Sequence, residues 1–307
     1  MKKFVLFFFA VITVICFNSC SKKRSGKPRV LVFGKTADFH HSSIPNGIAA
    51  IKKLGDENGF DVDSTTNADY FNEDSLKKYS AVIFLSTTGD VLTYNQQVAF
   101  ERFIQSGGGF MGIHAATDTE YDWGWYGRLV GAYFNGHPEQ QDAKFIIKDK
   151  THAATSFFQD TLWQRKDELY NFKKINPDIH VLVTIDESSY KGGTNGAFHP
   201  MAWYHEYDGG RAFYTELGHT EASYTEPNYL KHILGGIQYA IGDNNELDYA
   251  KAKSQYPPDE DRFVKTSLVQ AEFFEPTEMT VLPNLDILIV QRRGEVKLYK
   301  NDTKKVM

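Results

Sequence analysis

The sequence predicts an α/β protein built around a mostly parallel, doubly wound sheet. The first observation is a set of short apolar runs, at residues 29–34, 81–86 and 110–114, with the composition of strands buried on both faces. The second is that segments suited to helices separate these runs. The third is that the links are short. Strands that alternate with helices through short links are typical of a parallel sheet covered by helices on both faces.

The segments between these apolar runs predict the helices and the further strand of this alternation. Residues 44–55 carry an apolar stripe and end at a glycine, as a helix does. Residues 60–64 alternate between apolar and polar side chains and predict a strand. The next helix begins at Thr93, which can form a capping box with Gln96, and the glycines at 107–109 stop it.

The second half of the domain continues with strands, a hairpin and a closing helix. Asp208-Gly209-Gly210 is the turn of the predicted hairpin. Residues 229–241 place their apolar side chains on one face and predict a helix. The strands predicted in this half lie at residues 144–148, 179–185, 202–207 and 212–217.

The amino terminus has the features of a bacterial lipoprotein signal. Two lysines precede an apolar stretch at residues 4–17, which is shorter than the roughly 20 residues of a membrane-spanning helix. A small residue stands directly before Cys20, and this resembles a lipobox. The resemblance implies removal of residues 1–19 and lipid attachment to Cys20; the alternative is an ordinary signal peptide with a chance cysteine. Residues 20–28 would then be a basic tether, so we expect an exported protein held by lipid alone on the periplasmic side of the outer membrane.

The charge balance narrows the range of partners. The formal net charge is −5, and no stretch of the chain forms a basic stripe. Proteins that bind nucleic acid neutralise phosphates with clustered lysine and arginine. We therefore expect a small-molecule ligand, contact with a membrane only through the lipid, and no nucleic acid.

Histidines follow the predicted strands at the positions where such sheets bind ligands. In doubly wound sheets the ligand lies beyond the carboxyl ends of the strands. His40 and His41 follow the first strand, although this loop could simply cap the next helix. His114 follows the central strand at a sharp elbow, where an imidazole suits a general acid or base or a metal ligand. The alternative for His114 is a buried, hydrogen-bonded structural histidine.

Carboxylates and aromatic rings complete the candidate set. Asp118 lies four residues beyond His114, and His219 and Glu221 follow the predicted hairpin; with His114 these are the candidate catalytic residues. Aromatic rings offer apolar faces to sugars, although core packing is the alternative for each one singly. The residues expected to bind substrate are His40, His41, Glu120, Tyr121, Trp123, His137, Trp203, His205 and Glu206.

Four segments of the sequence resemble the ThuA-like (trehalose utilisation) family. They are residues 110–118, Gly136-His137-Pro138, residues 203–207 and Leu217-Gly218-His219-Thr220. The resemblance covers about residues 29–243. It implies a flavodoxin-like fold of the class I glutamine amidotransferase type, and a role in the use of trehalose and related disaccharides.

The resemblance also excludes one activity. The elbow cysteine of the amidotransferases is replaced here by His114, whereas their catalytic histidine and glutamate match His219 and Glu221. Without a thiolate no thioester can form, so the protein is not a glutamine amidotransferase.

Two functions from different classes remain open, and a metal-binding structural domain is a third possibility. The first is processing of a disaccharide or keto-sugar, with His114 and His219 exchanging protons. A metal such as zinc could assist, because three histidines and a carboxylate can bind zinc and leave a position open, although no close His-x-x-x-His spacing supports it. The second is a non-catalytic module that binds a sugar or a partner protein.

The carboxyl-terminal segment shows a second resemblance. Residues 244–266 are polar and contain Pro257-Pro258, as expected of a linker. Residues 267–307 resemble the opening blade of a glucose/sorbosone dehydrogenase, a β-propeller. A propeller needs at least about four blades of about four strands, whereas strands are predicted only at 279–283, 287–290 and 294–299. We expect an incomplete propeller start without dehydrogenase activity, and a sugar dehydrogenase as attached domain or partner.

Overall fold

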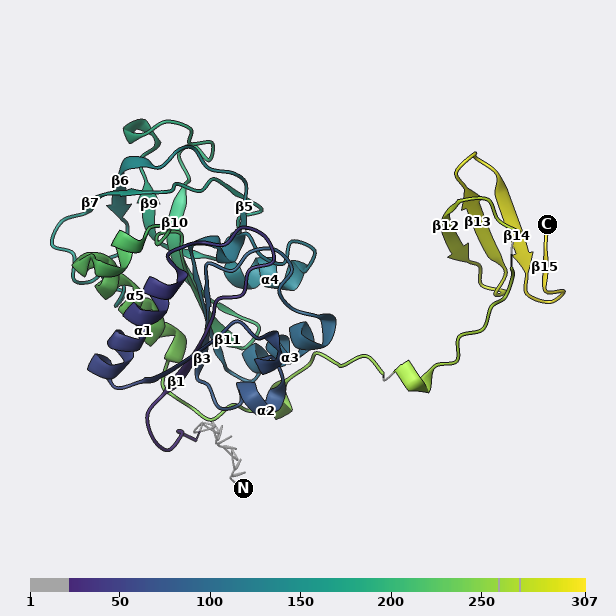
Figure 1. Ribbon diagram of the computed structural model, residues 1–307, viewed down its shortest axis with the longest axis horizontal. Helices are drawn as coiled ribbons and strands as arrows, with labels where there is room; N and C mark the ends of the chain where they lie inside the picture. Colours follow the sequence, from purple (N-terminus) through teal and green to yellow (C-terminus); the bar gives the residue numbers. More distant parts are fainter. Residues whose placement is uncertain (1–21, 259, 271) are drawn as a thin grey trace, which may run out of the picture. The chain divides into compact units, whose positions relative to one another are not determined.

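The computed structural model describes residues 22–258, 260–270 and 272–307 in two compact units (Figure 1). The first unit extends to Tyr256, and the second begins at Pro257. The predicted signal peptide at residues 1–19 and the predicted lipidation site Cys20 lie outside the described residues. Among the helices of the described ranges, none combines the length and the hydropathy needed to cross a membrane.

A nine-stranded sheet forms the centre of the first unit, and its first half is parallel. The apolar runs that predicted the strands are almost entirely buried, because helices cover both faces. The doubly wound prediction is therefore confirmed for this half. In spatial order its five parallel strands are β2 (Asp61–Thr65), β1 (Arg29–Phe33), β3 (Ala81–Leu85), β4 (Gly109–Ile113) and β11 (Gly210–Thr215).

The second half of the sheet is antiparallel. It continues from β11 through β10 (Pro200–Tyr207), β9 (His180–Ile185), β6 (Gln141–Ile147) and β7 (Leu162–Asp167). The edge strand β7 was not predicted, because its buried positions include the charged residues Arg165 and Asp167. An inward-facing charge conceals the alternation that identifies a half-buried strand.

Helices cover both faces of the sheet. Figure 1 shows α1 (Ile44–Asn58) and α5 (Pro227–Ile241) on one side, with α2 (Glu73–Leu76), α3 (Tyr94–Gln105) and α4 (Gly124–Val130) on the other. The capping box predicted from Thr93 and Gln96 is present at the start of α3. Helix α5 rests directly on β4: a Cβ at Gly109 would lie 1.8 Å from the carbonyl oxygen of Ala240, so this contact requires glycine.

A short connection brings part of the far edge back toward the parallel strands. β7 ends at Asp167, and only residues 168–171 separate it from β8 (Phe172–Lys173). β8 pairs with β5 (Tyr133–Phe134) in a separate two-stranded sheet. Glu168, in this connection, lies 3.4 Å from His114, which directly follows β4. The connection therefore passes the carboxyl ends of the parallel strands, where ligands bind in such folds.

The second unit contains one four-stranded antiparallel sheet. Its strands are β12 (Pro276–Val281), β13 (Ile287–Gln291), β14 (Val296–Lys300) and β15 (Lys305–Val306). Three of these strands coincide with the predicted ones, and β15 is additional. The sequence predicts such a small β segment in addition to the α/β domain.

Candidate functional site

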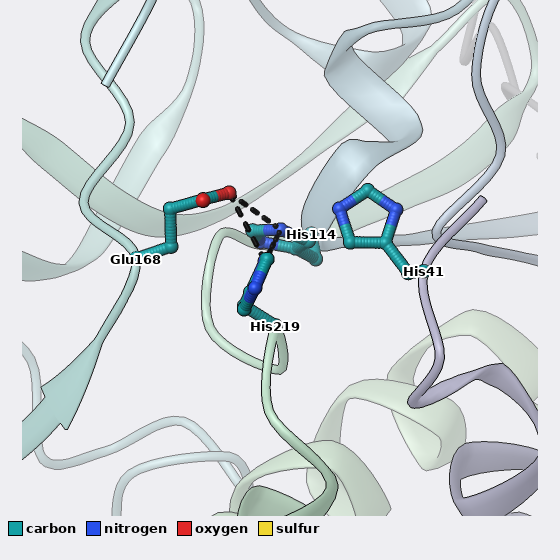
Figure 2. A group of neighbouring side chains, drawn as sticks. All are labelled: His41, His114, Glu168 and His219. Atoms are coloured by element: carbon teal, nitrogen blue, oxygen red, sulfur yellow. Dashed lines mark hydrogen bonds and ion pairs between the residues drawn. The ribbon is translucent and has the colours of Figure 1, made fainter. Parts of the chain in front are cut away.

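Four side chains from distant parts of the chain meet at the carboxyl end of the parallel strands (Figure 2). His41 lies in the loop between β1 and α1, His114 directly follows β4, and His219 follows β11. Glu168 comes from the connection between β7 and β8. One nitrogen or oxygen atom from each residue lies within 4.8 Å of those from the others, so this group could hold a metal ion.

His114 is held in a strained backbone conformation with its ring fixed. Its φ is +52°, in the left-handed region that non-glycine residues rarely adopt. Nδ1 lies 2.7 Å from the carbonyl oxygen of Glu216. Since a carbonyl can only accept, Nδ1 donates this hydrogen bond, and Nε2 is directed toward Glu168 and His219. A hydrogen bond from one ring nitrogen to a backbone carbonyl, as His114 Nδ1 makes, is the usual way in which a protein orients a metal-binding or basic imidazole.

Glu168 is the carboxylate around which the histidines gather. Its Oε2 lies 3.0 Å from Nδ1 of His219 and 3.4 Å from Nε2 of His114, and these two nitrogens are 3.1 Å apart. Its Oε1 lies 3.3 Å from Nδ1 of His137. Burial raises the pKa of Glu168, but the hydrogen bonds and charges of His114 and His219 outweigh burial and hold the pKa well below its ordinary value. Conversely, burial lowers the pKa of His219, and Glu168 outweighs it and raises that pKa.

His41 completes the group from the other side. Figure 2 shows Glu168 and His41 flanking the pair formed by His114 and His219. The His41 ring stands nearly perpendicular to both, at centroid distances of 4.8 Å and 5.1 Å. Burial, and then the charges of His114 and His219, lower the pKa of His41 to about 3, so the ring is neutral at physiological pH. Its buried Nδ1 has no hydrogen-bond partner among the described residues.

A layer of buried polar groups supports the cluster from behind. Asp167, the last residue of β7, accepts a hydrogen bond from the Gly218 amide at 3.1 Å. This bond ties the strand end directly before Glu168 to the loop that carries His219. The Tyr170 ring packs on His114 with a centroid distance of 4.5 Å, and its amide donates to Glu216 Oε1 at 3.1 Å. Burial raises the pKa of Glu216 well above its ordinary value. The supporting layer thus fixes both the backbone and the rings of the site.

Several predicted residues lie at the rim of this cluster. His137 contacts Glu168, and His40 is exposed beside His41 with its Nδ1 3.2 Å from Thr36 Oγ1. The Tyr121 hydroxyl donates to Asp118 at 2.6 Å. Burial raises the pKa of the half-buried Asp118 carboxyl, and the Tyr121 hydrogen bond only partly offsets this.

Glu221 does not have the place expected for it. The prediction paired it with His219, by analogy with the amidotransferase glutamate. In the structure Glu221 is exposed and accepts a hydrogen bond from the Ser42 hydroxyl. The carboxylate that contacts His219 is Glu168, so the predicted pairing is corrected.

Two residues that were predicted to bind substrate form hydrogen bonds with helix α3 and with the loop before it. Glu120 is buried, and its Oε1 accepts the amides of Val91 and Leu92 at 2.9 and 2.8 Å. Its Oε2 accepts from Gln97 at 2.6 Å, so the whole carboxylate is occupied. The Trp123 indole donates to Glu101 at 2.9 Å. These contacts organise the scaffold and leave neither residue at the histidine cluster.

The predicted residues of β10 lie elsewhere because of strand direction. β10 runs antiparallel to β11, with His205 opposite Ala212 and Glu206 opposite Arg211. This register carries His205 and Glu206 away from the end where β11 delivers His219. Trp203 is fully buried, and its indole donates to the Val130 carbonyl at 2.9 Å. A substrate role for these three residues is therefore corrected to a structural or surface role.

Glu168 was missed by the reasoning from sequence. It follows a strand with inward-facing charges and lies in a run without a glycine turn or a neighbouring histidine. One signal was present: Asp167 and Glu168 are adjacent acids at the end of an alternating segment. Acids at a strand end are candidate site residues once the strand itself is recognised.

With this geometry established, the family can be stated. The family model described as ThuA, trehalose utilisation, matches residues 29–240. The chain belongs to the ThuA family. The match spans the whole parallel half of the sheet and the loops that carry His41, His114, Glu168 and His219.

Solved structures of ThuA-like proteins share the fold. A ThuA-like protein from Bacteroides uniformis is 19% identical with a TM-score of 0.60, over 72% of this chain and 94% of that one. A ThuA-like protein from Parabacteroides merdae is 20% identical with a TM-score of 0.57, over 76% of this chain and 94% of that one. No curated protein matches the chain. The predicted flavodoxin-like, amidotransferase-like fold is confirmed, and the family implies a role connected with carbohydrate.

Proposed function

We propose that the ThuA domain is a metal-assisted, carbohydrate-processing enzyme, acting on a disaccharide or a keto-sugar while anchored by lipid outside the cytoplasm. One observation carries the proposal: three histidines and one glutamate converge at the carboxyl end of the parallel strands. Family membership supports carbohydrate as the substrate class. The signal-like amino terminus supports export to the periplasmic side of the outer membrane.

Zinc is the ion that best fits the four donors. Zinc binds histidine nitrogen at about 2.0–2.1 Å in tetrahedral sites, so neighbouring ligand atoms should lie about 3.3 Å apart. The three closest donor atoms, from His114, Glu168 and His219, are separated by 3.0, 3.1 and 3.4 Å. The fourth donor, His41, is neutral and carries a buried nitrogen without a partner among the described residues. An unpaired buried nitrogen is costly unless a ligand satisfies it.

The chain's own residues divide the remaining tasks. When bound, zinc would supply Lewis-acid polarisation of a sugar oxygen, which would join the four protein donors as a fifth ligand. Asp118, whose pKa is raised by burial and whose Oδ1 accepts a hydrogen bond from Tyr121, would be the carboxyl that exchanges a proton with the substrate. Phe39 is 64% exposed, and its ring lies 4.8 Å from the His41 ring, where it would offer an apolar face to a sugar.

A metal-free version of the same chemistry is the nearest competitor. In it, His219 and Glu168 form the acid–base pair, since their contact at 3.0 Å raises the pKa of the histidine. A non-catalytic module that delivers sugar to a dehydrogenase is the second candidate. It is favoured by the complete burial of His114, which leaves the elbow imidazole without direct exposure.

Turnover measurements separate these possibilities. The full chain, extracted in detergent, would be incubated with trehalose, other disaccharides and their keto derivatives, with zinc and with a chelator, and products followed by mass. The proposal predicts a product that is lost with the chelator and in the His114→Ala variant. Product that survives chelation would establish the metal-free pair. Saturable binding with the sugar recovered intact would establish the module.

A further inference from the structure

Two loops that supply half of the proposed metal ligands are tied together beside the site. One loop follows β1 and carries His41, and the other follows β11 and carries His219. The hydroxyl of Ser42 donates a hydrogen bond to the Glu221 carboxylate. The hydroxyl of the buried Ser43 donates to the carbonyl oxygen of Gly218 at 3.4 Å. Each tie lies within two residues of a proposed ligand.

We propose that Ser42 and Glu221 form a latch that positions His41 as the fourth ligand and so sets the affinity and geometry of the metal site. This inference rests on the proposed metal-assisted function. Ser42 and Glu221 are positioning residues, because neither is one of the four converging donors. The latch also gives Glu221 a role different from that of the amidotransferase glutamate.

His41 depends on its loop more than the other ligands do. The His114 ring is fixed by its own hydrogen bond to the Glu216 carbonyl, and Glu168 contacts three histidines. His41 Nδ1 has no such partner within the described chain. Its ring is therefore placed by packing and by the path of the loop. Outer residues that orient a ligand commonly change metal affinity 10–100-fold when they are removed.

The surroundings of the latch explain why it would be needed. Asp38, Phe39 and His40, the three residues before His41, are all exposed, and the Thr88 hydroxyl anchors this stretch by donating to the Phe39 carbonyl at 2.9 Å. Glu221 begins a short 3-10 helix, Glu221–Thr225, that packs beside α1. The latch thus joins an exposed loop to a packed element. Because Ser42 and Glu221 are themselves exposed, both can be replaced without opening the core.

Metal titration of the full chain tests the latch. Zinc affinity would be measured by competition with a chromophoric chelator, and coordination by the visible spectrum of the cobalt-loaded protein. Glu221→Ala and Ser42→Ala should each weaken zinc binding about 10-fold and alter the cobalt spectrum, since His41 is no longer held in place. The double variant should be no weaker than either single variant, because both remove one interaction. Glu221→Gln, which keeps an acceptor oxygen, should recover most of the affinity.

The controls separate the latch from the metal site itself. Asp56→Ala removes an exposed acid from α1 and should leave affinity and spectrum unchanged. Wild-type affinity and spectrum in Glu221→Ala would overturn the latch while leaving the metal site intact. Fully additive losses in the double variant would also overturn it. A wild-type chain that binds neither zinc nor cobalt would overturn the metal-assisted function, and the latch with it.

Discussion

Two kinds of buried histidine occur in the same domain, and they differ in what their ring nitrogens contact. His232 has Nδ1 2.9 Å from the Ala154 carbonyl and Nε2 3.1 Å from Thr215 Oγ1. His199 has both nitrogens 2.7 Å from an acceptor, on Glu187 and Tyr170. These two histidines are satisfied by the protein alone, which is the ordinary state of buried polar groups.

The histidines of the candidate site are not satisfied in this way. His114, His137 and His219 share one carboxylate, Glu168, and His41 has a buried nitrogen without a partner among the described residues. His114 adds backbone strain. Strain and incompletely paired polar groups persist where a function needs them. The contrast teaches that the convergence of several rings on one carboxylate distinguishes the histidines of the site. An unpartnered nitrogen alone does not, because Nδ1 of the buried His205 also lacks a partner among the described residues.

The largest effect should come from the shared carboxylate. Glu168→Gln keeps the shape of the side chain and removes its charge, so zinc affinity should fall more than about 100-fold, beyond the loss typical of an outer residue. Turnover should fall with it. Chelator competition and product analysis of the variant provide the check. Unchanged zinc affinity would contradict the distinction between the site histidines and the structural histidines.

The next effect concerns stability in acid and belongs to His232. Burial lowers the pKa of His232 from 6.5 to about 4; the charge of Arg165 adds to this, while the hydrogen bond to Ala154 opposes it. A depressed folded pKa means that its contribution to stability is complete above pH about 6.5 and is lost as the pH falls toward 4, by roughly 3 kcal/mol. His232→Gln should flatten this acid loss in urea unfolding between pH 7 and 4.5. An identical pH slope in the variant would contradict the assignment.

A smaller effect is expected at His199. His199→Gln cannot reproduce both short contacts, to Glu187 and to the Tyr170 carbonyl, so the free energy of unfolding should fall by about 2 kcal/mol. The measurement is urea unfolding at neutral pH. A variant as stable as the wild type would show that satisfied histidines contribute less to the fold than the comparison implies.

The smallest effect should come from Glu206, a carboxylate of β10 that lies away from the histidine cluster. Glu206 is exposed and lies opposite Arg211, away from the site. Glu206→Gln should therefore leave turnover within about twofold and stability within about 0.5 kcal/mol of the wild type. It matches Glu168→Gln in chemistry, so the pair compares position alone. A large loss of turnover in Glu206→Gln would place β10 in the site after all.

The parallel half of the fold and most of the histidines of the site could be predicted from the sequence. Buried parallel strands have continuous apolar runs, and the residue after such a run lies at the binding edge, which identified His41 and His114. Glu168 could not be found in this way, because β7 places Arg165 and Asp167 inward and hides its pattern.

The misplacement of His205 and Glu206 has a different cause. The predicted turn at residues 208–210 implies that the strand before it runs opposite to the strand after it. His205 and Glu206 are close to that turn, whereas His219 lies at the far end of the following strand. Strand direction, which the turn already fixes, therefore decides which end of the sheet a residue occupies.

X-ray absorption at the zinc edge of the zinc-loaded full chain tests the central claim most directly. The account predicts one ion per chain with four nitrogen and oxygen ligands at about 2.0–2.2 Å and the scattering pattern of histidine rings, lost in Glu168→Gln. A chain without zinc, or a zinc shell that lacks histidine, would contradict it.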